Sequence, residues 1–178
     1  NPIGQTAQDR LLIRFSSQEN PFLWTPSVTN TAGDLRVGSG SEIVTAVKTR
    51  REMVVLTDTS VFSMQFIGPP FTFGISQLAS NITVRGFNGA VAVGDAVIWM
   101  GYDRFYVYDG RVQVLPCTVR DHVFQDFNET QSDKVYAGVN SAFGEVFWFY
   151  PSETNSGANG GTDENDKYVV YNYDQKIW

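Results

Sequence analysis

Cys117 and His122 are the residues whose types come nearest to a catalytic pair, a thiol beside an imidazole. They are the chain's single cysteine and single histidine, and they lie five positions apart at the expected start of a helix. On an ideal helix this spacing turns the two side chains about 140° apart, and no third group orients the imidazole. One cysteine and one histidine also cannot assemble a zinc site. We expect Cys117 to be a small buried residue and His122 a solvated one.

Acidic residues suggest two other kinds of site, a calcium cage and a catalytic carboxylate pair. Asp163, Glu164 and Asp166 lie among glycines in the loop 152–166, but they lack the Asp-x-Asp-x-Asp-Gly spacing that presets a calcium cage. A solvated loop is therefore the expected reading. Three more aspartates lie in expected turns, namely Asp58, Asp103 and Asp109. Aspartates in turns usually bond the neighbouring backbone, so we predict no catalytic, metal-binding or cofactor-binding residues and no enzymatic activity.

Aromatic and basic side chains are the remaining candidates for ligand contact. The aromatics that could stack on sugar rings are Trp99, Tyr102, Tyr106 and Tyr108. Their alternating positions on strands favour core packing instead. The arginines that could meet a phosphate backbone, if they gathered at one rim, are Arg50, Arg51, Arg104 and Arg111. Isolated arginines in turns usually only increase solubility, so neither set predicts a binding site.

Composition places the chain among globular, β-rich proteins. Its 178 residues are 42% hydrophobic and 14% aromatic, which excludes a disordered chain. No apolar run approaches the roughly 20 residues of a membrane helix, so we expect no membrane insertion. The net charge of −6 disfavours binding to duplex DNA, because the overall field repels phosphate.

The elements that must position these residues are short strands joined by tight turns. The stretch 94–115 predicts a three-strand meander, with Asp109-Gly110 as a type I′ hairpin turn. A second meander is expected over 43–66, and Leu35 and Val37 suggest a short edge strand. Further expected strands are 10–15, 71–75, 82–84, 134–139, 145–150, 167–173 and 177–178.

One short helix is expected as an insertion near 118–128. Thr118 is the predicted N-cap, with Asp121 three residues later as a near capping box. The apolar face of this helix would contain Val119, Val123, Phe124 and Phe127.

A repeat at about 40–50 residues organises the strands. Leu12, Val54, Val97 and Phe147 fall in one column when four strands, each opened by a charged residue, are aligned. Repeated antiparallel meanders of this length are typical of β-propeller blades, and the long period disfavours a β-sandwich. We therefore predict an all-β fold in which residues 1–178 are part of one propeller domain. Its four units run roughly over 9–42, 43–89, 90–133 and 134–178.

Both ends of the series of units look incomplete. The chain starts at Asn1 without an initiator methionine and stops at Trp178 inside an apolar run. We expect this sequence to be a segment of a longer protein. Further blades would then come from outside the segment or from a neighbouring chain.

The order and residue types of these motifs resemble those of virion proteins of tailed bacteriophages. The stretches that carry the resemblance are 18–26, 57–61, 67–71, 99–110 and 171–178. They are similar to β-propeller components of the neck and tail, of the tail nozzle (tail tubular protein B) or packaged-DNA stabilisation type. The resemblance lies in the order of blade motifs and includes no active-site signature.

The resemblance implies a structural protein of the virion tail or neck, present as a homo-oligomeric ring at the portal vertex. Its partners would be a tail adaptor and other tail or portal proteins, and the genome would pass through the lumen without sequence-specific binding. Contact candidates are the loops 16–42, 116–133 and 152–166. The alternative is a carbohydrate-binding or depolymerising propeller, although the Ser-x-Asp-x-Gly-x-x-Trp boxes of sialidases are missing. A cellular peptide-binding scaffold is less favoured, since the chain has no Trp-Asp dipeptides.

Overall fold

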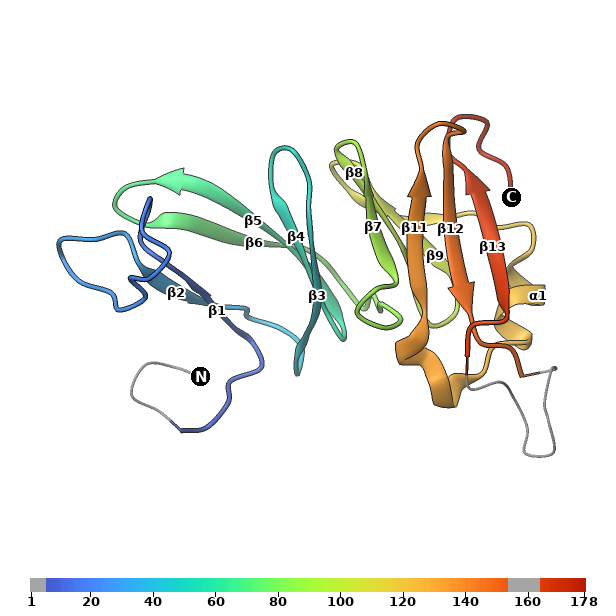
Figure 1. Cartoon of the computed structure of the whole chain (residues 1–178), viewed down its shortest axis with the longest axis horizontal. Helices are drawn as coiled ribbons and strands as arrows, with labels where there is room; N and C mark the ends of the chain where they lie inside the picture. The colour runs from blue at the N-terminus through green and yellow to red at the C-terminus, as the bar shows by residue number, and fades with distance from the viewer. Residues whose placement is uncertain (1–5, 154–163) are drawn as a thin grey trace.

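The computed structural model describes residues 6–153 and 164–178 and has an all-β fold (Figure 1). Its strands form four antiparallel sheets, and neighbours within each sheet are consecutive in the chain. Sheet I contains β1 (Leu12–Phe15) and β2 (Gly33–Arg36). Sheet II contains β3 (Ile43–Lys48), β4 (Met53–Thr57), β5 (Ser60–Gly68) and β6 (Thr72–Ser80). Sheet III contains β7 (Ala90–Val93), β8 (Ala96–Met100), β9 (Phe105–Tyr108) and β10 (Val112–Leu115). Sheet IV contains β11 (Tyr136–Asn140), β12 (Glu145–Tyr150) and β13 (Lys167–Asn172).

The four sheets pack in chain order, as an open row in Figure 1. Side chains alternate between the two faces of a strand, so a strand covered on both faces must be apolar at successive positions. Strand β8 shows this clearly. Val97 and Trp99 join the core shared with sheet II, whereas Ile98 and Met100 join the core shared with sheet IV. Strand β4 divides in the same way, with Val54 packed toward sheet III and Val55 toward sheet I.

The first strands of sheets II, III and IV lie side by side. Strand β7 contacts β3 on one side and β11 on the other. Just before β7, the main chain of Asn88 forms a parallel bridge with Tyr136, and the Ala137 amide donates to the Asn88 carbonyl at 2.7 Å. Sheets III and IV are thus joined at this edge through backbone as well as through side chains.

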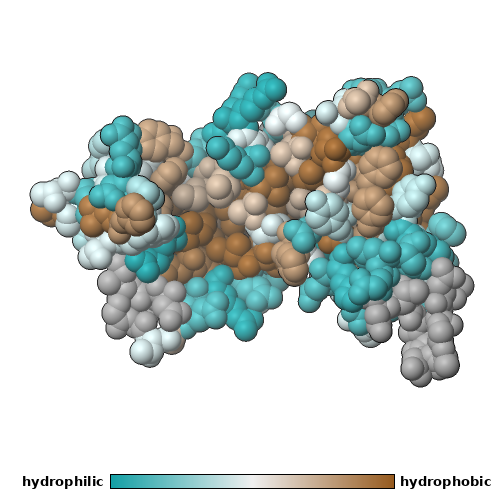
Figure 2. Space-filling view, viewed as in Figure 1, coloured by the Kyte–Doolittle hydropathy of each residue, from teal (hydrophilic) through white to brown (hydrophobic). Residues whose placement is uncertain are grey.

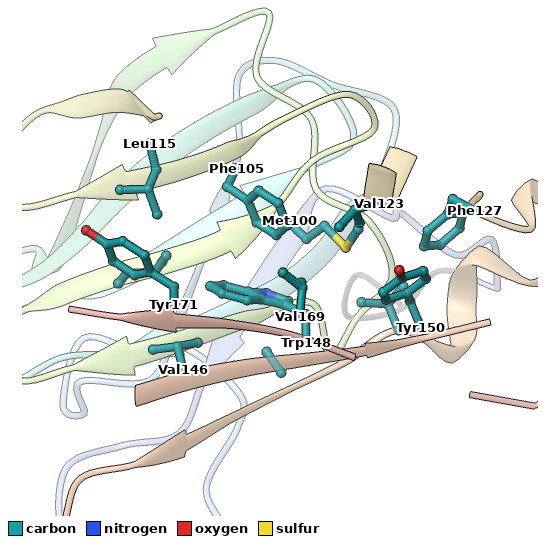
Figure 3. Close-up of a cluster of buried hydrophobic side chains, with 13 residues drawn as sticks. Met100, Phe105, Leu115, Val123, Phe127, Val146, Trp148, Tyr150, Val169 and Tyr171 are labelled. Atoms are coloured by element: carbon teal, nitrogen blue, oxygen red, sulfur yellow. The ribbon is translucent and has the colours of Figure 1, made fainter. Parts of the chain in front are cut away.

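The largest core lies between sheets III and IV. Figure 3 shows Met100 and Phe105 of sheet III above Trp148 and Val169 of sheet IV. The Trp148 indole donates to the Gly89 carbonyl at 3.0 Å, so its one polar group is satisfied inside the core. Trp178 closes the outer end of this core, with its ring centroid 4.5 Å from that of Phe105.

The helical insertion is confirmed, but its expected N-cap is wrong. Helix α1 runs over Arg120–Gln125 and begins after Val119, without a side-chain cap. A 3-10 helix, η1 (Glu129–Lys134), follows it, and here the Asn128 side chain accepts from the Thr130 amide. The helix is shorter than predicted, so of the expected apolar face only Val123 and Phe124 lie on it. Val119 precedes the helix and Phe127 follows it, although both belong to or pack against the same core.

Four details of the strands differ from the sequence predictions. The expected strand 177–178 is only an isolated bridge between Ile177 and Asn172. Strand β6 is nine residues long and pairs with β5, so sheet II has a fourth strand where only 71–75 was expected. Residues 82–84 form no strand. The turn at Asp109-Gly110 has positive φ at Gly110 alone, and it spans three residues before β10. It is therefore not a type I′ turn, which needs positive φ at both central positions.

In the described part of the chain, no helix is long and apolar enough to span a membrane.

Candidate functional site

Cys117 and His122 are placed as structural and surface residues. The Cys117 side chain packs against the core between sheets III and IV, and burial raises the pKa of its thiol to about 11. A thiol with this pKa is protonated at neutral pH and is a poor nucleophile. His122 is exposed on α1.

The aspartates in turns serve the fold. Asp58 accepts from the Ser41 amide at 2.8 Å and from its hydroxyl at 2.6 Å, which ties the β4–β5 turn to the chain before β3. Hydrogen bonds from the Arg104 guanidinium lower the pKa of Asp103. Asp109 accepts from the Gln113 side-chain Nε2 at 3.2 Å. The main partners are a distant residue for Asp58 and nearby side chains for Asp103 and Asp109, whereas the prediction was local backbone.

The predicted acidic loop lies largely outside the described residues, and Asp163 is among those not described. Asp166 accepts from both the amide and the hydroxyl of Ser152, each at 2.7 Å. The Glu164 carboxylate pairs with Lys134 at 3.3 Å. Over 6–153 and 164–178, no three Asp, Glu, His or Cys side chains gather in a way that could hold a metal ion.

The aromatic and basic candidates do not form one binding surface. Trp99, Tyr106 and Tyr108 are buried, which confirms that they pack in the core. Tyr102 is exposed, so the prediction of core packing is wrong for this residue. Arg51 lies near Asp95, with 3.7 Å between the charged groups. Of the other three arginines considered, Arg50 lies in the turn between β3 and β4, and Arg104 and Arg111 lie beyond opposite ends of β9.

The clearest candidate surface is the outward face of sheet IV. Direct partners in an antiparallel sheet share a face, so the register places Tyr136, Phe149 and Tyr168 in one row across β11, β12 and β13. Phe147 and Val170 form the neighbouring row on the same face. We call these five residues the aromatic face.

The aromatic face is apolar, ordered and open. Tyr136 is 53% exposed, Phe149 39% and Tyr168 62%. The rings already contact one another, with 5.9 Å between the centroids of Phe149 and Tyr168 and 6.2 Å between those of Phe147 and Phe149. Strand β12 reads Glu-Val-Phe-Trp-Phe-Tyr, which is the uninterrupted apolar pattern of a strand covered on both faces. Exposed apolar patches of this kind usually mark an interaction site.

The opposite end of the row of sheets is polar. In sheet I, Ile13 and Leu35 face sheet II, so Leu12, Arg14, Asp34 and Arg36 lie on the outward face. Arg36 pairs with Asp9 at 2.9 Å. Of the outward sheet faces at the two ends of the row, over the residues that the structure describes, that of sheet IV is the more apolar.

Sequence reasoning missed one central charged residue, Arg85. Its side chain is fully buried between the turn after β8 and the segment that contains Phe127, where its guanidinium stacks over the Phe127 ring at 3.9 Å and near the Tyr102 ring at 4.6 Å. It also donates to the Tyr102 carbonyl at 2.6 Å. A single arginine in a loop gives no signal of such an environment, since its partners come from distant segments.

A scan against protein-family models gives no match, and a search of the curated proteins finds no relative.

Proposed function

We propose that this chain is a run of consecutive β-propeller blades with a structural, non-enzymatic role. The observation that carries the proposal is the adjacency of β3, β7 and β11, the first strands of three successive meander sheets that pack face to face. In a propeller, first strands line the central axis and each blade covers a face of the next one. The repeat of about 40–50 residues supports the same arrangement.

The aromatic face is the surface on which the next blade would pack. Sheets II and III have apolar residues on both faces, and both faces are covered by neighbours. Sheet IV has the same sequence pattern with one face uncovered. A further sheet over Tyr136, Phe149 and Tyr168 would bury three large rings, at about 25 cal/mol for each Å² of apolar area.

The assembly that this blade series would serve is the neck or tail of a bacteriophage virion. The resemblance of residues 18–26, 67–71 and 99–110 to tail nozzle and packaged-DNA stabilisation proteins supports this role. Copies of the protein would form a ring at the portal vertex, in contact with a tail adaptor and other tail proteins. The net charge of −6 suits a conduit through which DNA passes without sticking.

The loop 16–42 is one contact surface that the proposal uses. Phe22 is 90% exposed there, and the Trp24 side chain is exposed beside it. Apolar side chains at a loop tip are favourable contacts for a neighbouring subunit.

Two measurements test this function. Sedimentation of the purified full-length protein should show a ring-sized oligomer, and mass spectrometry of mature virions should find the protein as a structural component. A protein that remains monomeric and is missing from mature particles would overturn the proposal. Binding in a saccharide screen, followed by cleavage of the bound glycan, would instead favour a carbohydrate-active propeller.

A further inference from the structure

A groove with an apolar floor and a basic rim lies between β1 and the β3–β4 hairpin. It encloses about 380 Å³. The rim contains Lys48 and Arg50, at the hairpin turn. The floor is made of apolar side chains from β1, β4, β5 and β6, namely Ile13, Phe15, Met53, Met64, Phe66 and Phe73. In Figure 2, hydrophobic residues gather in this region below hydrophilic residues at the hairpin tip. We call it the basic groove.

The register of sheet II explains why the floor and the rim lie together. Lys48 pairs with Met53, and Met53 pairs with Met64, so all three side chains lie on the face that looks toward sheet I. Neighbouring strands are about 4.8 Å apart, so this row extends about 10 Å from the basic rim across the apolar floor. A cationic end and an apolar end are thus built into one line of side chains.

Aromatic rings extend the floor away from Lys48. Phe66 of β5 pairs with Phe73 of β6, and their ring centroids are 5.8 Å apart. The Phe15 ring of β1 contacts Phe73, with 4.9 Å between the centroids. Phe66 is 62% exposed, so this end of the groove is accessible to solvent. Together with two flexible methionines, these rings form an adaptable apolar surface.

A hydrogen-bonded turn holds the basic rim in place. The Thr49 side chain is buried and its hydroxyl donates to the Glu52 carbonyl at 2.9 Å, while the Glu52 amide donates back to this hydroxyl at 3.2 Å. Arg50 lies within this turn. Neither Lys48 nor Arg50 forms an ion pair with any residue in the ranges 6–153 and 164–178.

The lining of the groove is positively charged, although the chain as a whole has a net charge of −6. Among the residues that the structure describes, four basic residues line it and one acidic residue, Glu52. The Glu52 carboxylate accepts from the Tyr108 hydroxyl at 2.7 Å, from the Gln65 amide at 3.2 Å and from the Ser63 hydroxyl. Its oxygens are therefore engaged by groups of sheets II and III, and the basic rim remains available to an anion.

We propose that the basic groove binds a small amphipathic anion, namely a carboxylate with an unbranched apolar tail, of the size of a medium-chain fatty acid. The carboxylate accepts from Lys48 and Arg50. The tail lies along the floor, over Met53, Met64 and Phe66. An inorganic anion would leave this floor in water, and a neutral hydrocarbon would leave the two cations without a partner. Ligand pockets of this size typically combine a largely apolar lining with a few polar groups that fix the orientation of the ligand.

Calorimetric titration of the full chain with decanoate, kept below its micelle concentration, tests the proposal. Binding should be saturable and should weaken as salt is added. Decyltrimethylammonium has the same tail and the opposite charge, so it should bind at least about tenfold more weakly. Acetate has the same head group without the tail, and it should show no measurable binding, because the apolar contacts supply much of the affinity.

The methionines locate the binding site. The chain has three, of which Met53 and Met64 line the groove, whereas Met100 is buried in the core between sheets III and IV. Nuclear magnetic resonance of isotope-labelled methionine methyl groups therefore contains its own control. Decanoate should shift the signals of Met53 and Met64 and leave that of Met100 unchanged.

Variants separate the charged rim from the apolar floor. Lys48→Gln combined with Arg50→Gln should weaken decanoate binding by about tenfold or more and abolish the preference over decyltrimethylammonium. Phe66→Ser should weaken the binding of both ligands, with little effect on folding, because that ring is largely exposed. Arg111→Gln, on an exposed arginine of another turn, is the matched control and should leave both affinities unchanged.

Several outcomes would overturn the inference. These are equal binding of decanoate and decyltrimethylammonium, a shift of Met100 instead of Met53 and Met64, unchanged binding in the double variant, or no binding at millimolar decanoate. Tight binding of inorganic phosphate or of single-stranded DNA, neither of which has an apolar tail, would contradict an amphipathic ligand. Signals of Met53 and Met64 that depend on protein concentration without ligand would show that a second copy covers the groove. The inference does not depend on the virion role, so the two can fail separately.

Discussion

The guanidinium of Arg85 donates to both carboxylate oxygens of Glu129, at 2.6 and 3.0 Å. Arg85 lies just after sheet II and Glu129 opens η1 before sheet IV, so the pair joins segments 44 residues apart in sequence. The Arg85 side chain is fully buried, whereas the Glu129 side chain is 60% exposed. Removal of the Arg85 side chain and removal of the Glu129 charge should therefore lower the free energy of unfolding by different amounts.

Loss of Arg85 should destabilise the protein more than loss of the Glu129 charge. Arg85→Ala should lower the free energy of unfolding by about 3–5 kcal/mol. It removes the group that donates to buried carbonyls and contacts two aromatic rings. Glu129→Gln should cost less, about 1–3 kcal/mol, because it leaves the buried guanidinium without its counter-charge but keeps that group's carbonyl and ring contacts. Urea unfolding measures both, with Arg111→Ala as the control. Equal losses for the two variants would contradict this assignment.

Gly89 should not tolerate a side chain. A Cβ at this position would overlap the carbonyl oxygen of Arg85, which is backbone and cannot move aside. The Gly89 carbonyl also accepts from the Met100 amide and from the Trp148 indole, each at 3.0 Å. Gly89→Ala should cost about 1–3 kcal/mol in thermal or urea unfolding. Gly38→Ala, where a Cβ meets nothing within 4 Å, should be nearly neutral.

Glu52 should make part of the stability depend on acid pH. Burial alone would raise the pKa of its carboxyl, but hydrogen bonds from Ser63, Tyr108 and Gln65 outweigh burial and lower the pKa below the ordinary 4.5. The stabilisation is therefore present above pH 4.5 and is lost as the pH falls through the lower folded value. Glu52→Gln should flatten stability against pH in this acid range, relative to the unchanged protein. Glu19→Gln, outside the sheets, should leave the profile as it was.

Tyr150 should make another part of the stability depend on alkaline pH. Burial, with the nearby Asp126 and Asp166, raises the pKa of its hydroxyl from 10 to about 12. A raised pKa gives stability that is complete below pH 10 and is lost as the pH rises toward 12. Tyr150→Phe should reduce the loss of stability between pH 10 and 12. Tyr168→Phe, on an exposed ring, is the control, and an equal change in both variants would argue against Tyr150 as the source.

Much of the strand pattern was predictable from sequence because both faces of the middle strands are buried. Runs such as residues 96–100 and 145–150 show the apolar continuity that two covered faces require. The length of β6 was not predictable, since Gly68-Pro69-Pro70 reads as a terminator although the chain turns back there and pairs again with β5. The cap of α1 was also missed, because neighbouring strands position this short helix in place of a side-chain cap.

The candidate surfaces were harder to predict than the strands. Phe147 and Phe149 have the residue types of core positions, and only the order of the sheets shows that their face is open. Lys48, Met53 and Met64 share one row of sheet II, which follows from a register that the sequence alone does not define.

A cryo-electron microscopy reconstruction of the full-length protein in its native particle tests the central claim most directly. We expect sheets II, III and IV to be successive blades around an axis lined by β3, β7 and β11, with another sheet packed on Tyr136, Phe149 and Tyr168. Copies should form a ring at the tail vertex. A reconstruction in which the aromatic face is exposed to solvent, or in which the vertex ring is made of other proteins, would contradict the claim.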